Sequence, residues 1–185
     1  MPEMIILMGE ERMQKTIDAL RKENALIRTG RANPTVLNNV NVSYYGALTP
    51  LNQIAQISAP EAQSLVIKPF DKNVLKDIEK AINLADLNLV PQSDGTVIRI
   101  MFPALTETRR KELVKEVKNI AENNKIAIRN IRRDCIEDLK KLEKNSEISE
   151  DELKRRTDEV QKLTDKYIEK IDALAKEKEE SIMEI

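Results

Sequence analysis

Residues 106–144 read TETRRKELVKEVKNIAENNKIAIRNIRRDCIEDLKKLEK, and the spacing of their apolar side chains decides the fold. Apolar or small residues recur every three or four positions, at Leu113, Val117, Ile120, Asn124, Ile128, Ile131, Cys135, Leu139 and Leu142. This period is typical of one face of an α-helix. Thr106 is suited to cap the helix, and Glu107 is favourable in its first turn. The pattern predicts a single helix of roughly 38 residues, about 55–60 Å long.

The flanking sequence predicts two more helices that pack against this one. Ser149 and Glu152 match a capping box, with Ile148 and Leu153 placed as a hydrophobic staple. The helix that follows has its apolar stripe at Leu153, Val160, Leu163, Tyr167, Ile171 and Leu174. Because only residues 145–148 connect the two long helices, they are predicted to be antiparallel neighbours. The third helix is predicted over residues 12–28, with Asn24 interrupting an apolar face made of Met13, Ile17, Leu20 and Ile27.

The segment between the helices has a different period. Gly30 permits a left-handed cap after the first helix, and Pro34 disfavours helix at Asn33. Strands are predicted where apolar residues alternate or form short runs, around residues 40–44, 64–67 and 96–102. Asp71 is placed to cap a short helix with a buried stripe of Val74, Leu75, Ile78, Ala81 and Ile82. We therefore expect a small mixed α/β unit.

The predicted fold class is α+β: an antiparallel three-helix bundle, residues 1–29 and 105–185, with an inserted α/β domain, residues 30–104. Neither long helix is stable alone with its apolar stripe exposed. The insertion leaves two covalent connections between the halves, near residues 29–34 and 102–106, and each contains a proline. Two connections permit limited swivelling about one axis. The expected hinge residues are Thr29, Gly30, Pro34, Pro103 and Ala104.

Composition excludes several classes of function. The 185 residues are 41% hydrophobic and 34% charged, and the apolar run at residues 4–8 is too short for a signal peptide, so we expect a soluble, cytoplasmic protein. With no histidine and a single cysteine, the usual transition-metal ligands and nucleophile–base pairs are missing. Glycine-rich phosphate motifs are missing as well. We expect no enzyme activity, metal or cofactor, and we interpret Cys135 as a small core residue.

Charge is unevenly distributed along the chain, although the formal net charge is only −1. Residues 105–145 hold twelve basic and eight acidic side chains, whereas residues 146–185 hold eight and thirteen. One row along the long helix, the basic row, is Lys111, Lys115, Lys118, Glu122, Lys125, Arg129, Arg132, Ile136 and Lys140. We take each member of this row to lie two positions before a residue of the apolar stripe. Two positions turn the helix by about 200°, so we expect the row to point away from the bundle core.

The basic row has the dimensions of a nucleic-acid backbone contact, since it is longer than about 40 Å. A solvated surface is the alternative, although aligned like charges repel and mixed signs serve solubility better. Aromatic residues are only 3% of the chain, which argues against stacking on single strands. Structured RNA recognised by its shape and phosphates fits this row better. On these residues alone, RNA binding and simple solvation remain equal alternatives.

A series of short segments stands out by its order and spacing: Arg28-Thr29-Gly30-Arg31-Ala32-Asn33-Pro34, Tyr44-Tyr45-Gly46, Thr49-Pro50-Leu51, Gln53-Ile54-Ala55, Pro69-Phe70-Asp71, Ile98-Arg99-Ile100, Pro103-Ala104-Leu105-Thr106-Glu107, Arg109-Arg110-Lys111 and Arg129-Asn130-Ile131-Arg132-Arg133-Asp134. Together they resemble the signature of bacterial ribosome recycling factors, from about residue 12 to the C-terminus. The resemblance implies a three-helix bundle with an inserted domain in an L shape, in agreement with the predicted fold.

The resemblance also implies a function. Members of this family bind the 70S ribosome after peptide release and, with elongation factor G and GTP, split it into subunits so that mRNA and tRNA leave. The factor is not an enzyme, because the GTP is used by its partner. The family's bundle lies on large-subunit rRNA, and the matching arginines here are Arg28, Arg31, Arg109, Arg110, Arg129, Arg132 and Arg133. The basic row adds Lys118 and Lys125 to these candidate contacts.

Further expectations concern the partners. In the family the smaller domain, here residues 30–104, faces elongation factor G and moves about the hinge. We expect a monomer with no membrane or DNA partner. The alternative from another class is a non-enzymatic adaptor that uses its long helices as a protein-interaction surface, without RNA.

The chain departs from the family pattern at three places. Asn88 stands where the family has a turn glycine, and since asparagine tolerates positive φ we expect the turn to survive. Phe70 stands where tryptophan is common, and we interpret it as a core residue. Residues 1–11 match the family poorly, so the resemblance assigns them no role.

Overall fold

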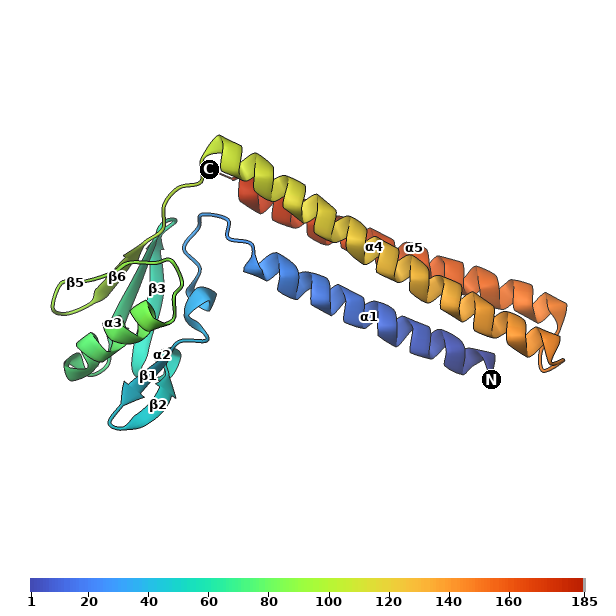
Figure 1. Ribbon diagram of the computed structural model, residues 1–185, viewed down its shortest axis with the longest axis horizontal. Helices are drawn as coiled ribbons and strands as arrows, with labels where there is room; N and C mark the ends of the chain where they lie inside the picture. Colours follow the sequence, from blue (N-terminus) through green and yellow to red (C-terminus); the bar gives the residue numbers. More distant parts are fainter. Residues whose placement is uncertain (185) are drawn as a thin grey trace. The chain divides into compact units, whose positions relative to one another are not determined.

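The computed structural model describes residues 1–184 and divides the chain into two compact units. The bundle comprises residues 1–28 and the chain from Thr106 onward, and the small domain comprises Thr29–Leu105. Three helices form the bundle, α1 (Pro2–Leu26), α4 (Glu107–Lys144) and α5 (Glu150–Met183), and each packs on the other two (Figure 1). The predicted class, a helical bundle with an inserted sheet domain, is confirmed.

The two long helices begin at the predicted caps. Thr106 Oγ1 accepts a hydrogen bond from the backbone N–H of Arg109 at 3.1 Å, and α4 then runs for 38 residues. Ser149 Oγ accepts from the backbone N–H of Glu152 at 3.1 Å, which starts α5. The buried positions of α4 run from Leu113 to Leu139 at the predicted spacing, except that Ala121 is buried where Ile120 was predicted, so the stripe faces the bundle core.

The first helix is longer than its prediction of residues 12–28. It begins at Pro2, where proline costs no helical hydrogen bond, and ends at Leu26. Ile6 and Gly9 extend the buried face N-terminally at the same three-to-four spacing as Met13. The predicted left-handed cap at Gly30 is wrong, because the helix is capped by Ile27 in an extended conformation.

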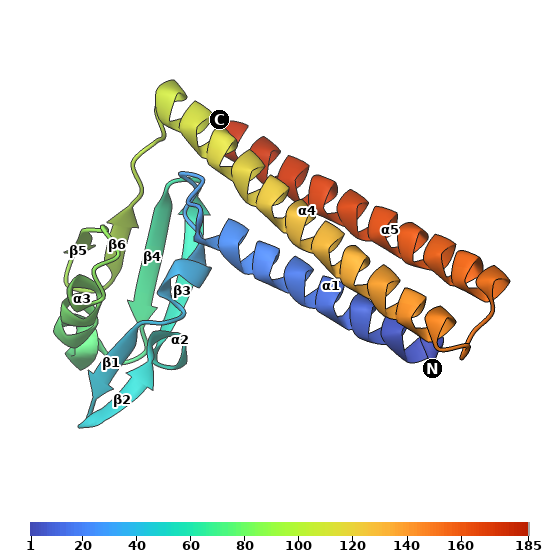
Figure 2. The same cartoon turned by 45° about the vertical axis from the view of Figure 1, so that its right-hand side comes forward.

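The small domain contains two antiparallel sheets (Figure 2). Strands β1 (Asn41–Tyr44) and β2 (Ala47–Pro50) form a hairpin. The four-stranded sheet has the order β3-β4-β6-β5, made of β3 (Ala55–Glu61), β4 (Ser64–Pro69), β6 (Ile98–Met101) and β5 (Pro91–Ser93). The sequence predicted β1, β4 and β6 and missed β2, β3 and β5, which are short or mostly exposed and so lack a clear alternation.

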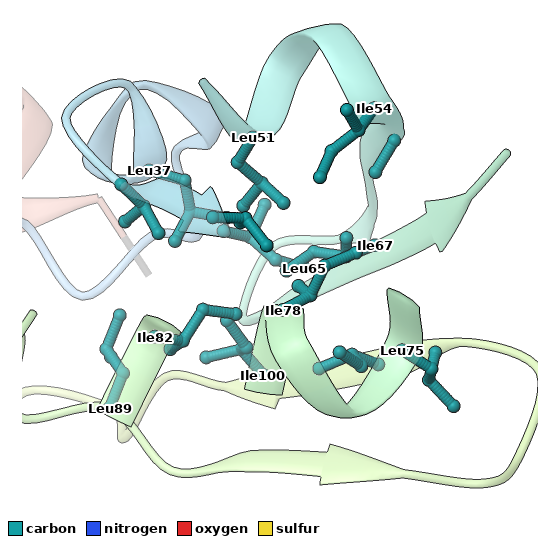
Figure 3. Packing of buried hydrophobic residues seen from close by; sticks show 14 of the residues in the cluster. Leu37, Leu51, Ile54, Leu65, Ile67, Leu75, Ile78, Ile82, Leu89 and Ile100 are labelled. Carbon is teal, nitrogen blue, oxygen red and sulfur yellow. The ribbon is translucent and has the colours of Figure 1, made fainter. Parts of the chain in front are cut away.

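One helix, α3 (Leu75–Leu84), covers the core of the small domain, and three shorter helical segments complete it: η1 (Pro34–Leu37), α2 (Leu51–Ile54) and η2 (Lys72–Val74). Asp71 caps η2 by accepting from the backbone N–H of Asn73 at 2.9 Å. Leu65, Ile67 and Ile100 of the sheet meet Ile78 and Ile82 of α3 in a fully aliphatic layer (Figure 3).

Two departures from the family pattern have different outcomes. Asn88 has φ = +54°, so the predicted left-handed turn is confirmed. The prediction of Phe70 as a core residue is wrong, because the side chain is 73% exposed. Alternation along β4 explains this, since Ile67 and Pro69 are buried while Lys68 and Phe70 point to the other face.

Candidate nucleic-acid interface

The basic row of α4 does not all point away from the bundle core, which corrects the sequence prediction. Its ends are exposed, at Lys111, Lys115, Lys118 and Lys140, but its middle is half-buried. Lys125 and Arg132 each lie three positions before a buried residue, Ile128 or Cys135, and not two. At about 100° per residue, three positions place them only about 60° from the apolar stripe. Lys125 and Arg132 therefore lie on the flank of α4 that faces α5.

Two contacts with α5 hold the middle of the row in place. Lys125 Nζ lies 2.5 Å from Asp172 Oδ1, and the lysine side chain is only 19% exposed. Arg132 donates from Nη1 to Gln161 Oε1 at 3.0 Å, and Gln161 in turn donates to Asp165. The sequence analysis assigned no contact between these cations and the last helix. The signal was available, since Asp172 directly follows the buried Ile171.

Two arginines of α4, Arg110 and Arg132, are half-buried. The Nε atoms of Arg110 and Arg132 are buried and have no hydrogen-bond partner within residues 1–184. An unpaired buried donor costs roughly 1–3 kcal/mol, so these side chains are held at an energetic expense. A side chain already held in one conformation loses less entropy when it binds a partner.

The remaining cations of α4 are paired only at the surface. Arg129 Nη1 lies 3.3 Å from Glu122 Oε1, Arg109 Nη1 lies 3.0 Å from Glu112 Oε2, and Lys111 Nζ lies 2.9 Å from Glu107 Oε1. Exposed pairs of this kind contribute about 0–1 kcal/mol each. These cations can therefore exchange their carboxylate for a phosphate at little cost. Lys118 and Arg133 are exposed on the same helix.

The other two candidate arginines follow α1. Arg28 is exposed and is the last residue of the bundle's first segment, whereas Arg31 is exposed and belongs to the small domain. From Ala32 onward the chain is tied to the small domain, because the backbone N–H of Ala32 donates to the Ala62 carbonyl at 2.7 Å.

The candidate hinge residues lie where helices and strands are absent, except Pro34, which begins η1. Gly30 has φ = +77°, a conformation that L side chains rarely adopt. A Cβ at Gly30 would lie 3.1 Å from Leu105 Cγ, so the two connections touch each other at this glycine. Thr29, Pro103 and Ala104 flank this contact in coil.

Other kinds of site find little support in the described part of the chain. Within residues 1–184 no group of three metal-ligating side chains comes together, and no helix is long and apolar enough to cross a bilayer. Cys135 is buried, and burial raises the pKa of its thiol, which disfavours the reactive thiolate. The interpretation of Cys135 as a core residue is confirmed.

Comparison with known proteins gives one consistent match. The family model described as "Ribosome recycling factor" matches residues 20–183. The ribosome-recycling factor of Bacillus subtilis is 57% identical over 98% of both chains, and that of a Geobacillus strain is 58% identical over 100% of both.

Solved structures agree with these relatives. A solution structure of the ribosome recycling factor has a TM-score of 0.80 and 41% identity, covering 100% of this chain and 98% of the other. Models for the T. thermophilus ribosome recycling factor and the E. coli elongation factor G, bound to the E. coli post-termination complex, have a TM-score of 0.65 and 47% identity over 100% of both chains.

Proposed function

The chain belongs to the ribosome recycling factor family, and we propose how its two units divide the work of recycling. Its function is to act with elongation factor G on the post-termination ribosome, in the bacterial cytoplasm, and it has no catalytic activity of its own. The observation that carries this conclusion is the match of the whole chain, in sequence and in fold, to bacterial recycling factors.

The bundle is the part that holds large-subunit rRNA. The proposed contacts are Arg109, Arg110, Lys118, Arg129, Arg132 and Arg133 on α4, with Arg28 after α1 and Arg31 in the first connection. Supporting this, Arg110 and Arg132 are half-buried, Arg132 is also held by Gln161, and Arg109 and Arg129 have only weak surface partners. Lys125 has a different role, because its ammonium group is committed to Asp172. It fastens α4 to α5 beside the arginines.

The small domain faces elongation factor G and moves relative to the bundle during splitting. The proposed hinge is narrower than the sequence suggested: residues 29–31 and 103–105, because Ala32 is already bonded to the small domain. Gly30 supports this role, since its left-handed backbone is in a conformation that other residues adopt with strain.

Co-sedimentation with purified ribosomes at several salt concentrations tests the rRNA contact. Arg129→Glu and Arg132→Glu are expected to weaken binding by about tenfold or more and to reduce its salt dependence, because each arginine neutralises phosphate. Arg155→Glu on α5 is the matched control, since Arg155 is exposed and only loosely paired with Glu152 at 3.9 Å. Binding that is absent at low salt, or unchanged in Arg132→Glu, would contradict the proposal.

Cross-linking the small domain to the bundle tests the hinge. The cross-linked protein is expected to bind ribosomes as before and to lose subunit splitting with elongation factor G. The uncross-linked double-cysteine variant, in a background without Cys135, is the control. Splitting that survives complete cross-linking would rule out a mechanism based on swivelling.

A further inference from the structure

The guanidinium group of Arg132 is held by a neutral side chain of α5. Arg132 Nη1 donates to Gln161 Oε1 at 3.0 Å, and Gln161 Nε2 donates to Asp165 Oδ1 at 2.9 Å. Within residues 1–184, Arg132 forms no ion pair with a carboxylate. The amide of Gln161 therefore separates the cation of α4 from the carboxylate of Asp165.

The chemistry of its two neighbours fixes the orientation of the Gln161 amide. A guanidinium group only donates hydrogen bonds, and an ionised carboxylate only accepts them. The amide oxygen must therefore face Arg132, and the amide nitrogen must face Asp165. Because Asp165 lies four positions after Gln161 on α5, the two side chains share one face of the helix. The carboxylate thus keeps the amide turned to receive the arginine.

The two neighbouring cations of the basic row are held differently, because their partners are carboxylates. Lys125 pairs with Asp172 of α5. Arg129 pairs with Glu122 of α4. A carboxylate partner offsets the charge that a cation presents to phosphate, and it must be displaced before the cation is fully available. A neutral amide oxygen holds a cation without offsetting its charge.

We propose that Gln161 is a positioning residue for the rRNA contact, which holds Arg132 in place while leaving its full charge for a phosphate. This inference rests on the proposed function, because it takes Arg132 as an rRNA contact. A long side chain that is already held loses less entropy on binding, which is the contribution of the hydrogen bond. The contribution of the neutral partner is electrostatic, since each unpaired cation can neutralise one phosphate.

Co-sedimentation of the full chain with purified ribosomes, over a range of salt concentrations, tests the positioning. Arg132→Ala is expected to weaken binding by about tenfold or more, and Gln161→Ala by about three- to tenfold, the cost of ordering one long side chain. The salt dependence should fall by about one phosphate contact in Arg132→Ala and stay unchanged in Gln161→Ala, which keeps the charge. In the Arg132→Ala background, Gln161→Ala should cause no further loss, because its effect passes through the arginine.

Exchanging the amide and the carboxylate tests the role of charge. Gln161→Glu/Asp165→Asn keeps the net charge of the chain, and the new amide at position 165 can donate to the new carboxylate at position 161. This variant should hold Arg132 at least as firmly, but with its charge offset. Ribosome binding is therefore expected to weaken by about tenfold, and the salt dependence to fall by about one phosphate contact. Unchanged binding would overturn the proposal that a neutral partner is needed.

The bundle contains a matched control in which a glutamine makes the same arrangement without a cation. Gln14 Nε2 of α1 donates to Asp18 Oδ1, four positions later, at 3.1 Å. Gln14 Oε1 accepts from the Tyr167 hydroxyl of α5 at 3.3 Å. Gln14→Ala is expected to leave ribosome binding and its salt dependence unchanged. Circular dichroism should show equal helix content in all variants.

The outcomes separate this inference from the proposed function. If Arg132→Ala binds ribosomes as tightly as the unchanged protein, the assignment of Arg132 to rRNA is wrong, and the role of Gln161 is wrong with it. If Arg132→Ala weakens binding and Gln161→Ala does not, the rRNA contact stands and the positioning role alone is overturned. Equal losses in Gln14→Ala and Gln161→Ala, or a loss in Gln161→Ala that persists without Arg132, would also overturn it, because both would indicate a general effect on the bundle.

Discussion

The bundle and the small domain fill their cores with different kinds of side chain. Sixteen buried hydrophobic residues, all aliphatic except Phe102, form one cluster in the small domain, where Ser64 is the buried polar residue among those described. In the bundle, Asn24, Asn124 and Thr164 are buried among the hydrophobic residues. The buried side-chain atoms without a partner in residues 1–184, Asn24 Oδ1, Arg110 Nε and Arg132 Nε, also lie in the bundle.

This difference indicates that the bundle keeps buried polar side chains for binding, at a cost in stability. Each unpartnered buried polar group costs roughly 1–3 kcal/mol, so the bundle retains side chains that an aliphatic core would not need. Two of its three unpaired atoms belong to arginines that we assign to rRNA contacts. None of these unpaired buried atoms belongs to the small domain. Its core suits a unit that moves as a rigid body. The comparison predicts that each unit responds separately to changes in its own core.

Ile67→Ala is expected to give the largest effect. Ile67 is fully buried in β4, and truncation of such a side chain typically costs about 2–5 kcal/mol of unfolding free energy. If the units are independent, the loss is confined to the small domain. Thiol labelling of Cys135, which is buried in the bundle, reports this directly and should stay as slow as in the unchanged protein. If labelling accelerates as the small domain unfolds, the two units unfold cooperatively and the prediction is wrong.

Gly9→Ala is expected to destabilise the bundle by about 1–3 kcal/mol, the usual cost of overpacking. A Cβ at residue 9 would lie 2.5 Å from Cys135 Sγ, so the thiol must rotate away or the two helices must move apart. Urea unfolding followed by circular dichroism measures the loss. Replacing the sulfur removes the clash, so Gly9→Ala/Cys135→Ala should be more stable than the two single changes predict together. Additive effects of the two substitutions would disprove the contact.

Periodicity predicted the bundle because each long helix carries its own caps and an unbroken stripe. It failed at α1, where the apolar residues before Met13 show no single-face pattern, since they are apolar on both sides. It also failed for the middle of the basic row, because a slip of one position moves a side chain by about 100° around a helix. The partners Gln161 and Asp172 lie on another helix, and only the packing of α4 on α5 brings them to Arg132 and Lys125.

The small domain was harder to predict for a physical reason. Its strands have three to seven residues, and pairing between distant segments decides which of them form. Turn chemistry was more reliable than strand pattern, as the left-handed Asn88 shows. The candidate rRNA arginines came from the family resemblance and only Lys118 and Lys125 from the basic row, because a cation at the surface has no local signal that separates binding from solvation.

Asn24→Leu tests the difference between the two cores, because it replaces a buried polar side chain of the bundle by an apolar one. Asn24 is buried in α1, and its Oδ1 has no partner. Replacing an unpaired polar group by an apolar one of similar size is expected to stabilise the bundle by about 1 kcal/mol, measured by urea unfolding. Asn24→Asp is the control and should destabilise it, because a charge replaces the amide. A loss of stability in Asn24→Leu would show that the amide has a partner, such as a bound water.

The smallest effects come from pH, and they separate the two units by opposite signs. In the small domain, backbone N–H groups of Val97 and Thr96 bond Asp94 at 2.9 Å and lower the pKa of its carboxyl from 3.8 to about 2. A lowered folded pKa means that the carboxylate stabilises this turn above pH 3.8, and that its contribution is lost as the pH falls to about 2. In the bundle, burial raises the pKa of the Cys135 thiol, so this thiol adds no pH dependence in acid, and its contribution to stability is lost as the pH rises above the ordinary thiol value of 9.0. The amide NMR signals of Thr96 and Val97 should therefore titrate with a midpoint near 2. Asp94→Asn should abolish that titration. Cys135→Ala should remove the part of the alkaline loss that begins above pH 9.0, while burial of Tyr167, which raises the pKa of its hydroxyl above 10.0, leaves a further loss at higher pH. An amide midpoint near 3.8 would show that the turn does not hold the Asp94 carboxylate.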